Sequence, residues 1–429
     1  MASALSQAVN QHRPDLGPLQ ELYKFLHQNP ELSNQESQTA SLIAEKLQVV
    51  GPDDLVIKTS IGGHGLAAVL ANGDGPTVLL RADIDALPVE ERTGLPYAST
   101  KRMIHAASGV EKPVMHACGH DMHITCLLGA AAALFSARAT WSGTLVLVFQ
   151  PAEERGTGAQ AMIDDGLYTR HGIPVPDVVL GAHVMPFRAG AIGTGRGIVA
   201  TSADSMEVTI HGRGSHASMP HTAIDPIVIA ASTIMKLQTL VSRETDPADS
   251  SVVTVATVHA GDAENVIADS AVLGIDTRST TVETRERMMR RIKAVVSSEC
   301  ACAESTQEPE FKMTRSFPLT INDIETTKKI EDTFSVHFGE EKGQYNRNLP
   351  RLGGSEDFSI LATAVGKPYC FFMYGSIEES RWDQIEAQGT IHKDIPANHS
   401  PMFAPVIMPT LQTGLDGYVL GALTFFGKR

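Results

Sequence analysis

The sequence predicts an α/β protein: a first domain with a mostly parallel central sheet flanked by helices, and an inserted α+β domain of ferredoxin-like type. Up to residue 199, continuous apolar runs alternate with helical segments, which is typical of a sheet covered on both faces. Beyond that point, strands with period-two alternation appear in the order β-α-β-β-α-β of a ferredoxin-like sandwich. We therefore expect residues 1–199 and 316–429 to form one domain and residues 200–315 the other.

The first domain opens with helical apolar spacing over residues 16–50, interrupted at Asn29-Pro30. Short apolar runs then predict its strands, and periodic or Ala- and Leu-rich segments predict its helices. The expected strands are residues 65–70, 77–80, 144–149, 178–180 and 369–374. The expected helices are residues 124–137, 159–166 and 326–338, with a C-terminal helix from about residue 405.

The inserted domain begins with a half-exposed strand, because residues 205–210 alternate between apolar and polar side chains. The further strands are expected at residues 251–258, 271–276 and 311–314. The two helices are expected at residues 224–242 and 282–298. A helix thus separates the first strand from the second and the third from the fourth, as the ferredoxin-like order requires.

The composition is that of a globular protein, with 42% hydrophobic and 20% charged residues among 429. A formal charge of −14 disfavours nucleic acid as a ligand, because phosphate binding needs a basic face. No apolar run approaches the roughly 20 residues of a membrane span, and residues 1–15 lack the apolar core of a secretory signal. Five scattered cysteines suit a reducing compartment. We expect a cytoplasmic protein with no nucleic-acid or membrane partner.

Acidic and histidine side chains directly follow three of the predicted strands. They are Asp83 and Asp85, Glu153 and Glu154, and His183. Because ligands of open α/β sheets bind beyond the carboxyl ends of the strands, we expect these side chains at one edge. Asp83 and Asp85 share a face of an extended chain, so one of them could hydrogen-bond a ligating histidine. Taken alone, His183 would more often be a core histidine than a ligand. The neighbouring pair Glu153 and Glu154, taken alone, would more often be a charged turn after a strand.

The strongest single signal is the segment His116-Ala117-Cys118-Gly119-His120-Asp121-Met122-His123. It lies just before the predicted helix at residues 124–137. Cys118 and His120 are two residues apart, so a turning backbone could aim both at one metal. Thiolate, imidazole and carboxylate ligands suit Zn- or Mn-like divalent ions. The alternative is a solvated polar loop with a buried free cysteine, and the strand-end residues argue against it.

These motifs resemble those of the M20 metallopeptidases, and within them the aminoacylase-like amidohydrolases that include hippurate hydrolases and plant auxin-conjugate hydrolases. The matching pieces span nearly the whole chain in order. They are Pro30-Glu31-Leu32-Ser33, Arg81-Ala82-Asp83-Ile84-Asp85-Ala86-Leu87-Pro88, Gly94-Leu95-Pro96-Tyr97, His116-Ala117-Cys118-Gly119-His120-Asp121, Gln150-Pro151-Ala152-Glu153-Glu154, Gly181-Ala182-His183, Gly214-Ser215-His216-Ala217, Asn265-Val266-Ile267, Gly354-Ser355-Glu356-Asp357-Phe358 and Asn398-His399-Ser400-Pro401.

The resemblance implies a site with two divalent metal ions per subunit, Mn or Zn, with Co or Ni as alternatives. Cys118 would bridge the two ions. The other implied ligands are His120, Glu154, His183 and His399. Glu153 would be the general base, and Asp85 would support a ligating histidine. The expected reaction is attack of a metal-activated water on an amide carbonyl.

The inserted domain would be the family's lid, which often also forms a homodimer. His216 would then stabilise the oxyanion, reaching into the site of the neighbouring subunit. Asn265 and Arg278 fall where related enzymes hold substrate, although Arg278 could instead be an exposed arginine at a strand end. Ser355 could touch substrate, but Gly-Ser-Glu-Asp is also a good helix start, and we favour that capping role.

Two departures from the family pattern concern the pocket. The expected Asn-Val-Ile-Pro motif ends here in Ala268, which could loosen that loop. The stretch at residues 101–114 is longer than usual and could reshape the pocket mouth.

The expected function is hydrolysis of N-acyl amino acids or related small amides. Three alternatives stay open: a dipeptidase or carboxypeptidase with the same site, amide synthesis in the reverse direction, and a non-catalytic paralogue that binds a small ligand. The presence of every expected ligand and of the base argues against the last.

Overall fold

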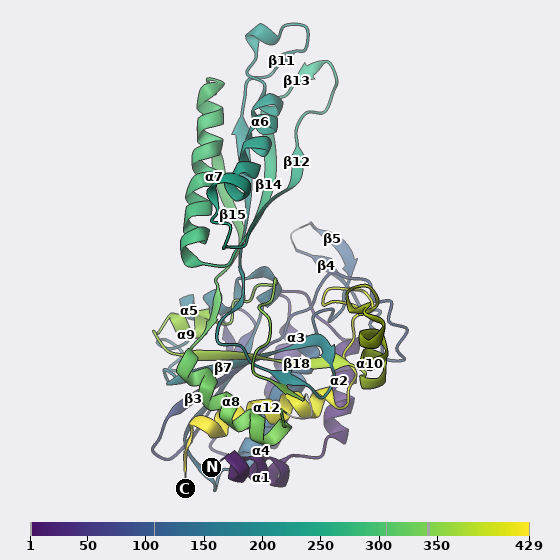
Figure 1. The fold of residues 1–429 in the computed structure, drawn as a ribbon, viewed down its shortest axis with the longest axis vertical. Coiled ribbons are helices and arrows are strands. Elements are labelled where there is room, and N and C mark those ends of the chain that lie inside the picture. The colour runs from purple at the N-terminus through teal and green to yellow at the C-terminus, as the bar shows by residue number, and fades with distance from the viewer. Residues whose placement is uncertain (1, 107, 306, 341–343, 429) are drawn as a thin grey trace. The chain divides into compact units, whose positions relative to one another are not determined.

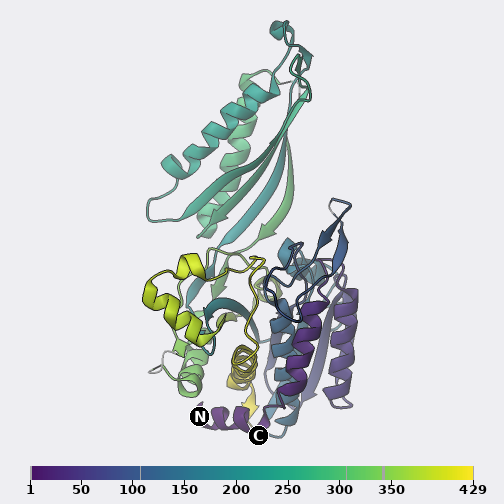
Figure 2. The same cartoon turned by 90° about the vertical axis from the view of Figure 1, so that its right-hand side faces the viewer.

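A computed structural model describes residues 2–106, 108–305, 307–340 and 344–428. The chain folds as two compact units, which can be followed in Figure 1 and Figure 2. Unit 1 comprises Met1–Val199, Ile321–Arg351 and Asp357–Arg429. Unit 2 comprises Ala200–Thr320 and the short return segment Leu352–Glu356. Among the described residues, none of the helices is long and apolar enough to cross a membrane.

Unit 1 is an α/β structure. Its helical elements are α1 (Ala2–His12), α2 (Gly17–Gln28), α3 (Ser37–Val50), α4 (His120–Ser136), η1 (Glu153–Arg155), α5 (Gly158–Asp164), α8 (Ile324–Phe338), α9 (Ile360–Thr363), α10 (Glu379–Gln388), α11 (Ile391–Asp394) and α12 (Thr410–Phe425). Its strands are β1 (Val56–Ile61), β2 (Gly65–Asn72), β3 (Thr77–Asp83), β4 (Arg102–His105), β5 (Val110–Pro113), β6 (Trp141–Gln150), β7 (Val178–Arg188), β8 (Ile192–Gly193), β17 (Tyr345–Asn346), β18 (Tyr369–Ile377) and β19 (Gly427–Lys428). Strands β9 (Gly197–Ala200) and β16 (Thr320–Asn322) pair at the junction with unit 2.

The main sheet runs in the order β1-β2-β6-β3-β7-β18-β8-β17. The four neighbours β6, β3, β7 and β18 are parallel, whereas β2 is antiparallel to both β1 and β6, and β8 is antiparallel to β18. The α/β class is therefore confirmed, but the sheet is mixed rather than mostly parallel. The reason is local: β1 and β2 are joined by a tight turn through Gly62 and Gly63, and strands joined this way must run antiparallel.

Helices α4 and α12 lie at the centre of the hydrophobic core of unit 1. Residues 120–131 of α4 are all buried, and the helix packs against α12 and β3. A helix without a polar face has to be covered on all sides, and α4 fits this rule because its sequence is rich in Ala and Leu. The C-terminal helix starts at Thr410, later than residue 405, directly after Pro409.

Unit 2 contains a four-stranded antiparallel sheet in the order β12-β14-β10-β15. Figure 2 shows its two long helices, α6 and α7, on one face of that sheet. The elements are β10 (Ser202–His211), β11 (Ser215–His216), η2 (Pro220–Thr222), α6 (Pro226–Thr239), η3 (Leu240–Glu244), β12 (Ser251–His259), β13 (Val266–Ile267), β14 (Ser270–Ser279), α7 (Val282–Cys302) and β15 (Glu310–Phe317). Alternate residues of β14 are buried against the helices, as period-two alternation predicts.

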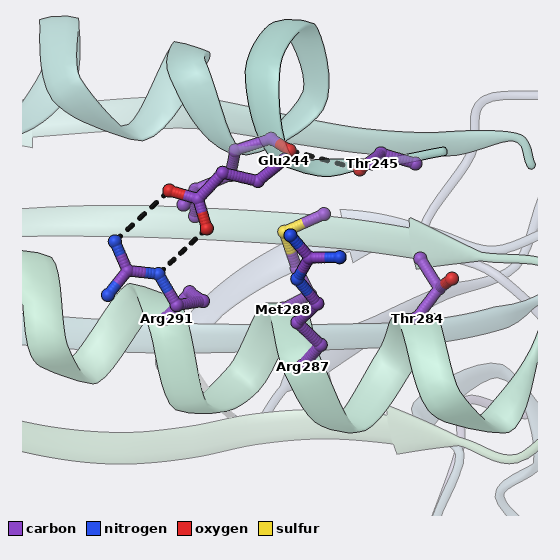
Figure 3. A pocket seen from close by; sticks show the side chains of 7 residues that line it. Glu244, Thr245, Thr284, Arg287, Met288 and Arg291 are labelled. Carbon is purple, nitrogen blue, oxygen red and sulfur yellow. Dashed lines mark hydrogen bonds and ion pairs between the residues drawn. The ribbon is translucent and has the colours of Figure 1, made fainter. Parts of the chain in front are cut away.

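Both helices of unit 2 have capped N-termini. The Asp225 side chain accepts a hydrogen bond from the Ile227 N–H, and the Thr281 side chain accepts one from the Thr284 N–H. A small cavity of about 20 Å³ lies where η3 meets α7 (Figure 3). The ion pair between Glu244 and Arg291, at 2.8 Å, lines it, and the space suits no more than a water molecule.

Candidate active site

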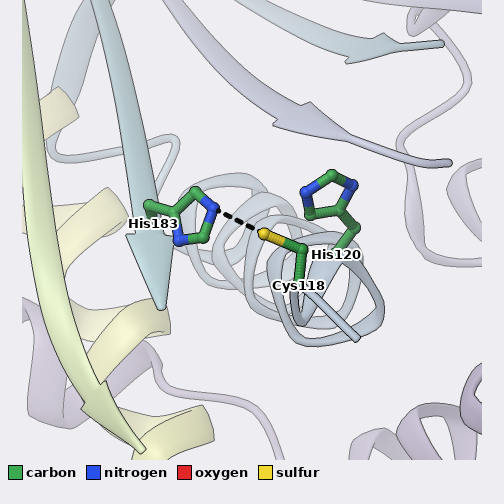
Figure 4. Close-up of side chains that lie close together, drawn as sticks. All are labelled: Cys118, His120 and His183. Atoms are coloured by element: carbon green, nitrogen blue, oxygen red, sulfur yellow. Dashed lines mark hydrogen bonds between the residues drawn. The ribbon is translucent and has the colours of Figure 1, made fainter. Parts of the chain in front are cut away.

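Five potential metal ligands from distant parts of the chain meet in unit 1. Cys118 and His120 lie at the start of α4, Glu154 lies in η1 after β6, and His183 lies on β7. His399 follows α11 and is the most exposed of the five, with 55% of its side chain accessible. Figure 4 shows Cys118, His120 and His183 converging from the α4 and β7 sides.

The five ligand atoms divide into two groups that share one sulfur. The first group is Cys118, His120 and His183, and the second is Cys118, Glu154 and His399. Within each group all ligand atoms lie within 4.8 Å of one another. The Cys118 Sγ to His183 Nε2 distance and the Glu154 Oε1 to His399 Nε2 distance are both 3.4 Å. This arrangement fits two cations that share a sulfur ligand.

The chemistry of these side chains also fits metal binding. His120 Nε2 and Glu154 Oε1 are buried and, among the described residues, have no hydrogen-bond partner. Buried polar atoms are rarely left unsatisfied, so a ligand is needed here. Thiolate, imidazole and carboxylate together match Zn²⁺ or Mn²⁺. At His183, Nδ1 donates to the carbonyl of Val184 at 2.7 Å, which leaves Nε2 unprotonated and able to bind a cation.

Burial and mutual repulsion set the protonation of the metal-free site. Burial, reinforced by the charges of Glu154 and Glu153, holds the pKa of the Cys118 thiol well above its usual value. Burial lowers the pKa of His120, but the nearby Asp83 and Asp85 carboxylates outweigh it and raise that pKa to about 10. Burial holds the pKa of His183 well below its ordinary value. Cation binding must therefore displace protons from this cluster.

Unusual backbone conformations aim two of the ligands. Gly119, between Cys118 and His120, has φ +84°, and a Cβ there would lie 2.4 Å from Val184 Cγ1. His399 has φ +71°, and its N–H donates to the Ala117 carbonyl at 2.8 Å. Glycine tolerates the left-handed region, whereas a histidine there is strained, so the hydrogen bond stabilises an unfavourable conformation.

Asp85 contacts His120, whereas Asp83 lies 3.6 Å from His120 Nε2 and pairs more closely with His123. Asp85 Oδ1 lies 3.3 Å from His120 Nδ1, and its Oδ2 accepts the main-chain N–H of Glu154 at 3.1 Å. Asp83 instead pairs with His123 Nδ1 at 2.5 Å, while His123 Nε2 accepts the Val184 N–H at 2.8 Å. His123 is thus occupied by structural hydrogen bonds.

Glu153 lies next to the potential ligand Glu154, in a turn after β6. Only 5% of its surface is exposed, and its Oε2 lies 4.0 Å from His120 Nε2. Ala152, just before it, has φ +49°, in the left-handed region. The turn brings both carboxylates to the same His120 nitrogen, because Glu154 Oε1 and Glu153 Oε2 lie 3.8 and 4.0 Å from His120 Nε2.

The remaining sequence-predicted residues lie in unit 2. His216 is exposed on β11, and its Nδ1 lies 2.7 Å from the Ser218 hydroxyl. Asn265 is exposed next to β13, and its carbonyl accepts the Ala217 N–H. Arg278 contacts Asp276 at 3.2 Å and donates to the Ser355 hydroxyl at 2.9 Å.

The preferred capping role of Ser355 is wrong. Helix α9 begins only at Ile360, and Ser359 occupies its N-cap position. The Ser355 hydroxyl is instead the partner of Arg278. In the long stretch that begins at residue 101, β4 and β5 pair as antiparallel strands, with Arg102 opposite Pro113.

Two buried features behind the site escaped sequence reasoning. His27 lies between Asp121 and Glu91, at 2.7 and 3.0 Å. The Glu36 carboxyl accepts the Ala152 N–H at 2.9 Å. Both contacts join residues more than sixty positions apart, so spacing could not reveal them, although the Pro30-Glu31-Leu32-Ser33 motif lies between His27 and Glu36.

Comparisons with known proteins agree with this geometry. Peptidase family M20/M25/M40 matches residues 79–390. The N-acetyl-L-cysteine deacetylase of Bacillus subtilis is 36% identical over 81% of this chain and 78% of its own length. The hippurate hydrolase of Campylobacter jejuni is 36% identical over 83% and 88%. The crystal structure of a dinuclear metal-binding peptidase of family M20 from Bacillus subtilis matches with a TM-score of 0.71 and 27% identity, over 95% of this chain and 98% of that one.

Proposed function

The chain belongs to peptidase family M20/M25/M40, and from this premise we propose that it hydrolyses the amide bond of N-acyl amino acids or related small amides. The observation that carries the proposal is the Cys118 sulfur, common to two groups of ligand atoms, with the acidic Glu153 beside them. The N-acetyl-L-cysteine deacetylase and hippurate hydrolase relatives support the substrate class, since both names describe N-acyl amino acids.

The proposed cofactor is a pair of divalent cations, Mn or Zn, with Co or Ni as alternatives. The ligands would be Cys118, shared by both ions, and His120, Glu154, His183 and His399. When bound, such ions lower the pKa of a water molecule and polarise the substrate carbonyl. Asp85 would keep His120 oriented through its Nδ1, 3.3 Å away.

Glu153 is the proposed general base. Its carboxylate would accept a proton from the attacking water and later deliver it to the departing amine. Glu154 is less suited to this role, because its Oε1 lies 3.4 Å from His399 Nε2 in the second group of ligand atoms. His216 would donate a hydrogen bond to the carbonyl oxygen as negative charge develops.

Arg278, Ser355 and Asn265 are the proposed substrate-binding residues. The guanidinium of Arg278 suits bidentate pairing with a free carboxylate. Asp276 and Ser355 already fix its side chain, which lowers the entropy lost on binding. A free carboxylate on the amino acid part of the substrate would be its partner.

The test of the proposed function is Glu153→Gln. Purified protein loaded with Mn or Zn should hydrolyse N-acetyl or N-benzoyl amino acids, and a chelator should abolish this. The variant should retain its metal content but lose about 100- to 10,000-fold in kcat, the usual contribution of a general base. Near-normal turnover of the variant would contradict the assignment. Dipeptides in the same panel would separate N-acyl substrates from the dipeptidase or carboxypeptidase alternative.

We also propose that the protein is a homodimer formed through unit 2. The outer surface of α6 exposes Ile227, Val228 and Met235, and β12 is an edge strand with exposed Val252. Exposed apolar side chains together with an open strand edge favour self-association. Light scattering should give about twice the chain mass of 45.9 kDa. The double variant Val228→Glu and Met235→Glu should give the single chain mass.

A reducing compartment such as the cytoplasm is the proposed location. The five cysteines are free in the structure, and Cys118 must be a reduced thiolate to bind metal. Fractionation of cells that express the tagged chain would test this.

A further inference from the structure

Glu36 is a buried carboxylic acid behind the turn that carries Glu153 and Glu154. It has no solvent exposure. Its Oε1 accepts two main-chain N–H groups, that of Asn34 at 2.8 Å and that of Ala152 at 2.9 Å. Both of these residues have left-handed backbones, with φ of +65° and +49°. One oxygen atom therefore stabilises two strained positions, and one of them directly precedes Glu153.

The position of Glu36 in the sequence would favour a different role. It immediately precedes α3, where an acidic side chain normally caps its own helix. In the structure Glu36 makes no such bond. Glu31 takes the capping role instead, because its Oε2 accepts the Thr39 N–H at 2.8 Å and the Thr39 hydroxyl at 2.9 Å. The Glu36 side chain is thereby left to contact the distant Ala152.

The Ala152 turn is held from its other side as well. The Ala152 carbonyl accepts the N–H groups of Gly158 at 3.2 Å and Thr157 at 3.4 Å. At Gly158 the chain passes so close that an added Cβ would lie 1.5 Å from the Pro151 carbonyl oxygen. A non-glycine residue keeps a left-handed conformation only where its surroundings enforce it. Here the enforcing contacts are Glu36 on the N–H side and residues 157–158 on the carbonyl side.

The same short segment contacts the other carboxylate that supports the site. The Ser33 hydroxyl donates to Asp85 Oδ2 at 2.6 Å, and Asp85 Oδ2 also accepts the Glu154 N–H. The Glu31 carbonyl accepts the Ala86 N–H at 2.8 Å. Residues 31–36 thus contact both the segment after β3, which carries Asp85, and the turn after β6, which carries Glu153 and Glu154.

We propose that Glu36 is a positioning residue: by accepting the Ala152 N–H, its side chain fixes the turn that aims Glu153 at the reacting water and Glu154 at its cation. This inference rests on the proposed function. The positioning role requires an acceptor oxygen within hydrogen-bond distance of the Ala152 N–H, and it does not require a negative charge on Glu36. Burial, with the charge of Asp85 adding to it, raises the pKa of Glu36 to about 8, so the neutral acid is the major form at neutral pH.

Three variants separate positioning from stability. Glu36→Gln keeps an acceptor oxygen at the same reach, Glu36→Asp keeps the acid but shortens the side chain by one methylene, and Glu36→Met removes the acceptor. Glu31→Met is the matched control, because it removes a neighbouring buried acid whose side chain bonds Thr39 and not the turn. Asp is a good N-cap residue, so Glu36→Asp should fold even if Glu36→Met does not.

The expected results follow from the loss of one hydrogen bond. Glu36→Asp and Glu36→Met should lower kcat about 100-fold with little change in KM, the effect of misplacing a reacting group by about 1 Å. Their affinity for Mn²⁺, measured by titration calorimetry, should fall about 10- to 100-fold because Glu154 is misplaced. Glu36→Gln should stay within about threefold of wild type in both measurements. Glu31→Met should lower the melting temperature but leave kcat within about threefold.

Wild-type kcat in Glu36→Asp, or an equal kcat loss in Glu31→Met, would overturn the positioning role. A 100-fold loss in Glu36→Gln would overturn it too, because charge and not the acceptor would then matter. Failure of the proposed function looks different: the wild type itself would not hydrolyse N-acyl amino acids. The calorimetric Mn²⁺ titration of the same variants would still decide the inference in that case.

Discussion

The main-chain N–H of Glu154 donates a hydrogen bond of 3.1 Å to the Asp85 carboxylate, whose other oxygen lies 3.3 Å from the imidazole of His120. The Asp85 carboxylate therefore links the segment that carries Glu154 with the segment that carries His120. These two residues are the proposed ligands of different cations. The link connects the end of β3 with η1 and α4, three elements that are far apart in the sequence.

Asp85→Asn should weaken metal binding. An asparagine has only one acceptor oxygen, so it cannot accept from Glu154 and also from a protonated His120 Nδ1. We expect Mn²⁺ affinity to fall about 10- to 100-fold by titration calorimetry. Ser33→Ala is the control, since it removes one donor to Asp85 and leaves both acceptor roles intact. Equal affinity in Asp85→Asn and wild type would refute the linking role.

Cys118→Ser should reduce occupancy of both cation positions together. A serine hydroxyl is a harder and far less acidic ligand than a thiol, and the sulfur belongs to both ligand groups. Elemental analysis after dialysis should give well under one cation per chain instead of about two. Cys302→Ser removes an exposed cysteine at the end of α7 and should leave the metal content unchanged. Loss of only one cation from Cys118→Ser would show that the sulfur is not shared.

Gly119→Ala should destabilise the loop that carries Cys118 and His120. The positive φ costs about 1–2 kcal/mol for a residue with a Cβ, and the new methyl group would lie 2.4 Å from Val184. We expect a lower melting temperature and weaker metal binding. Gly94→Ala is a useful comparison, because Gly94 also has a positive φ but an added Cβ there would meet no atom within 4 Å. Similar metal affinity in both variants would argue against the steric explanation.

His27 should make stability fall with rising pH. Burial lowers the pKa of His27, but the hydrogen bonds to Asp121 and Glu91 outweigh it and raise the pKa from 6.5 to about 10. Between these values the folded state binds more protons than the unfolded state, so this stabilisation is complete below pH 6.5 and lost towards pH 10.

The measurement for His27 is urea unfolding of metal-free protein at about pH 6 and about pH 9.5. His27→Gln should show a smaller decrease in the free energy of unfolding between the two pH values than wild type does. His392→Gln, which replaces an exposed histidine on α11, should follow the wild type. An identical decrease in His27→Gln would show that His27 is neutral in the folded state.

Sequence patterns predicted the elements of the fold well because most of them are local. Continuous apolar runs located β3, β6 and β18, and the Ala- and Leu-rich run at residues 124–137 located α4. Whether neighbouring strands run parallel or antiparallel was harder to predict from the sequence. The antiparallel β1–β2 pair depends on a turn at Gly62 and Gly63, and β7 extends to Arg188 by pairing with β18 beyond the end of its pairing with β3. The β7–β18 pairing joins strands that are distant in sequence, so local patterns do not reveal it.

For the candidate site as well, the sequence predicted some features and not others. Motif recognition brought forward Cys118, His120, Glu154, His183 and His399, and the structure brings these side chains together. It also singled out Asp85 as the partner of a ligating histidine, and Asp85 Oδ1 lies 3.3 Å from His120 Nδ1, but it gave no sign that Asp83 pairs with His123. The exchange of roles between Glu31 and Glu36 was equally hidden, since local rules favour the acid nearest the helix as its cap.

The sulfur common to both ligand groups has a consequence for how the protein would be loaded. The first cation to arrive would have to expel the thiol proton, because burial keeps Cys118 protonated without a metal ion. A second cation would then meet a sulfur that is already ionised and would not have to expel that proton again. The two binding steps should accordingly differ in their pH dependence, and a mixed-metal enzyme could be assembled by the order of addition.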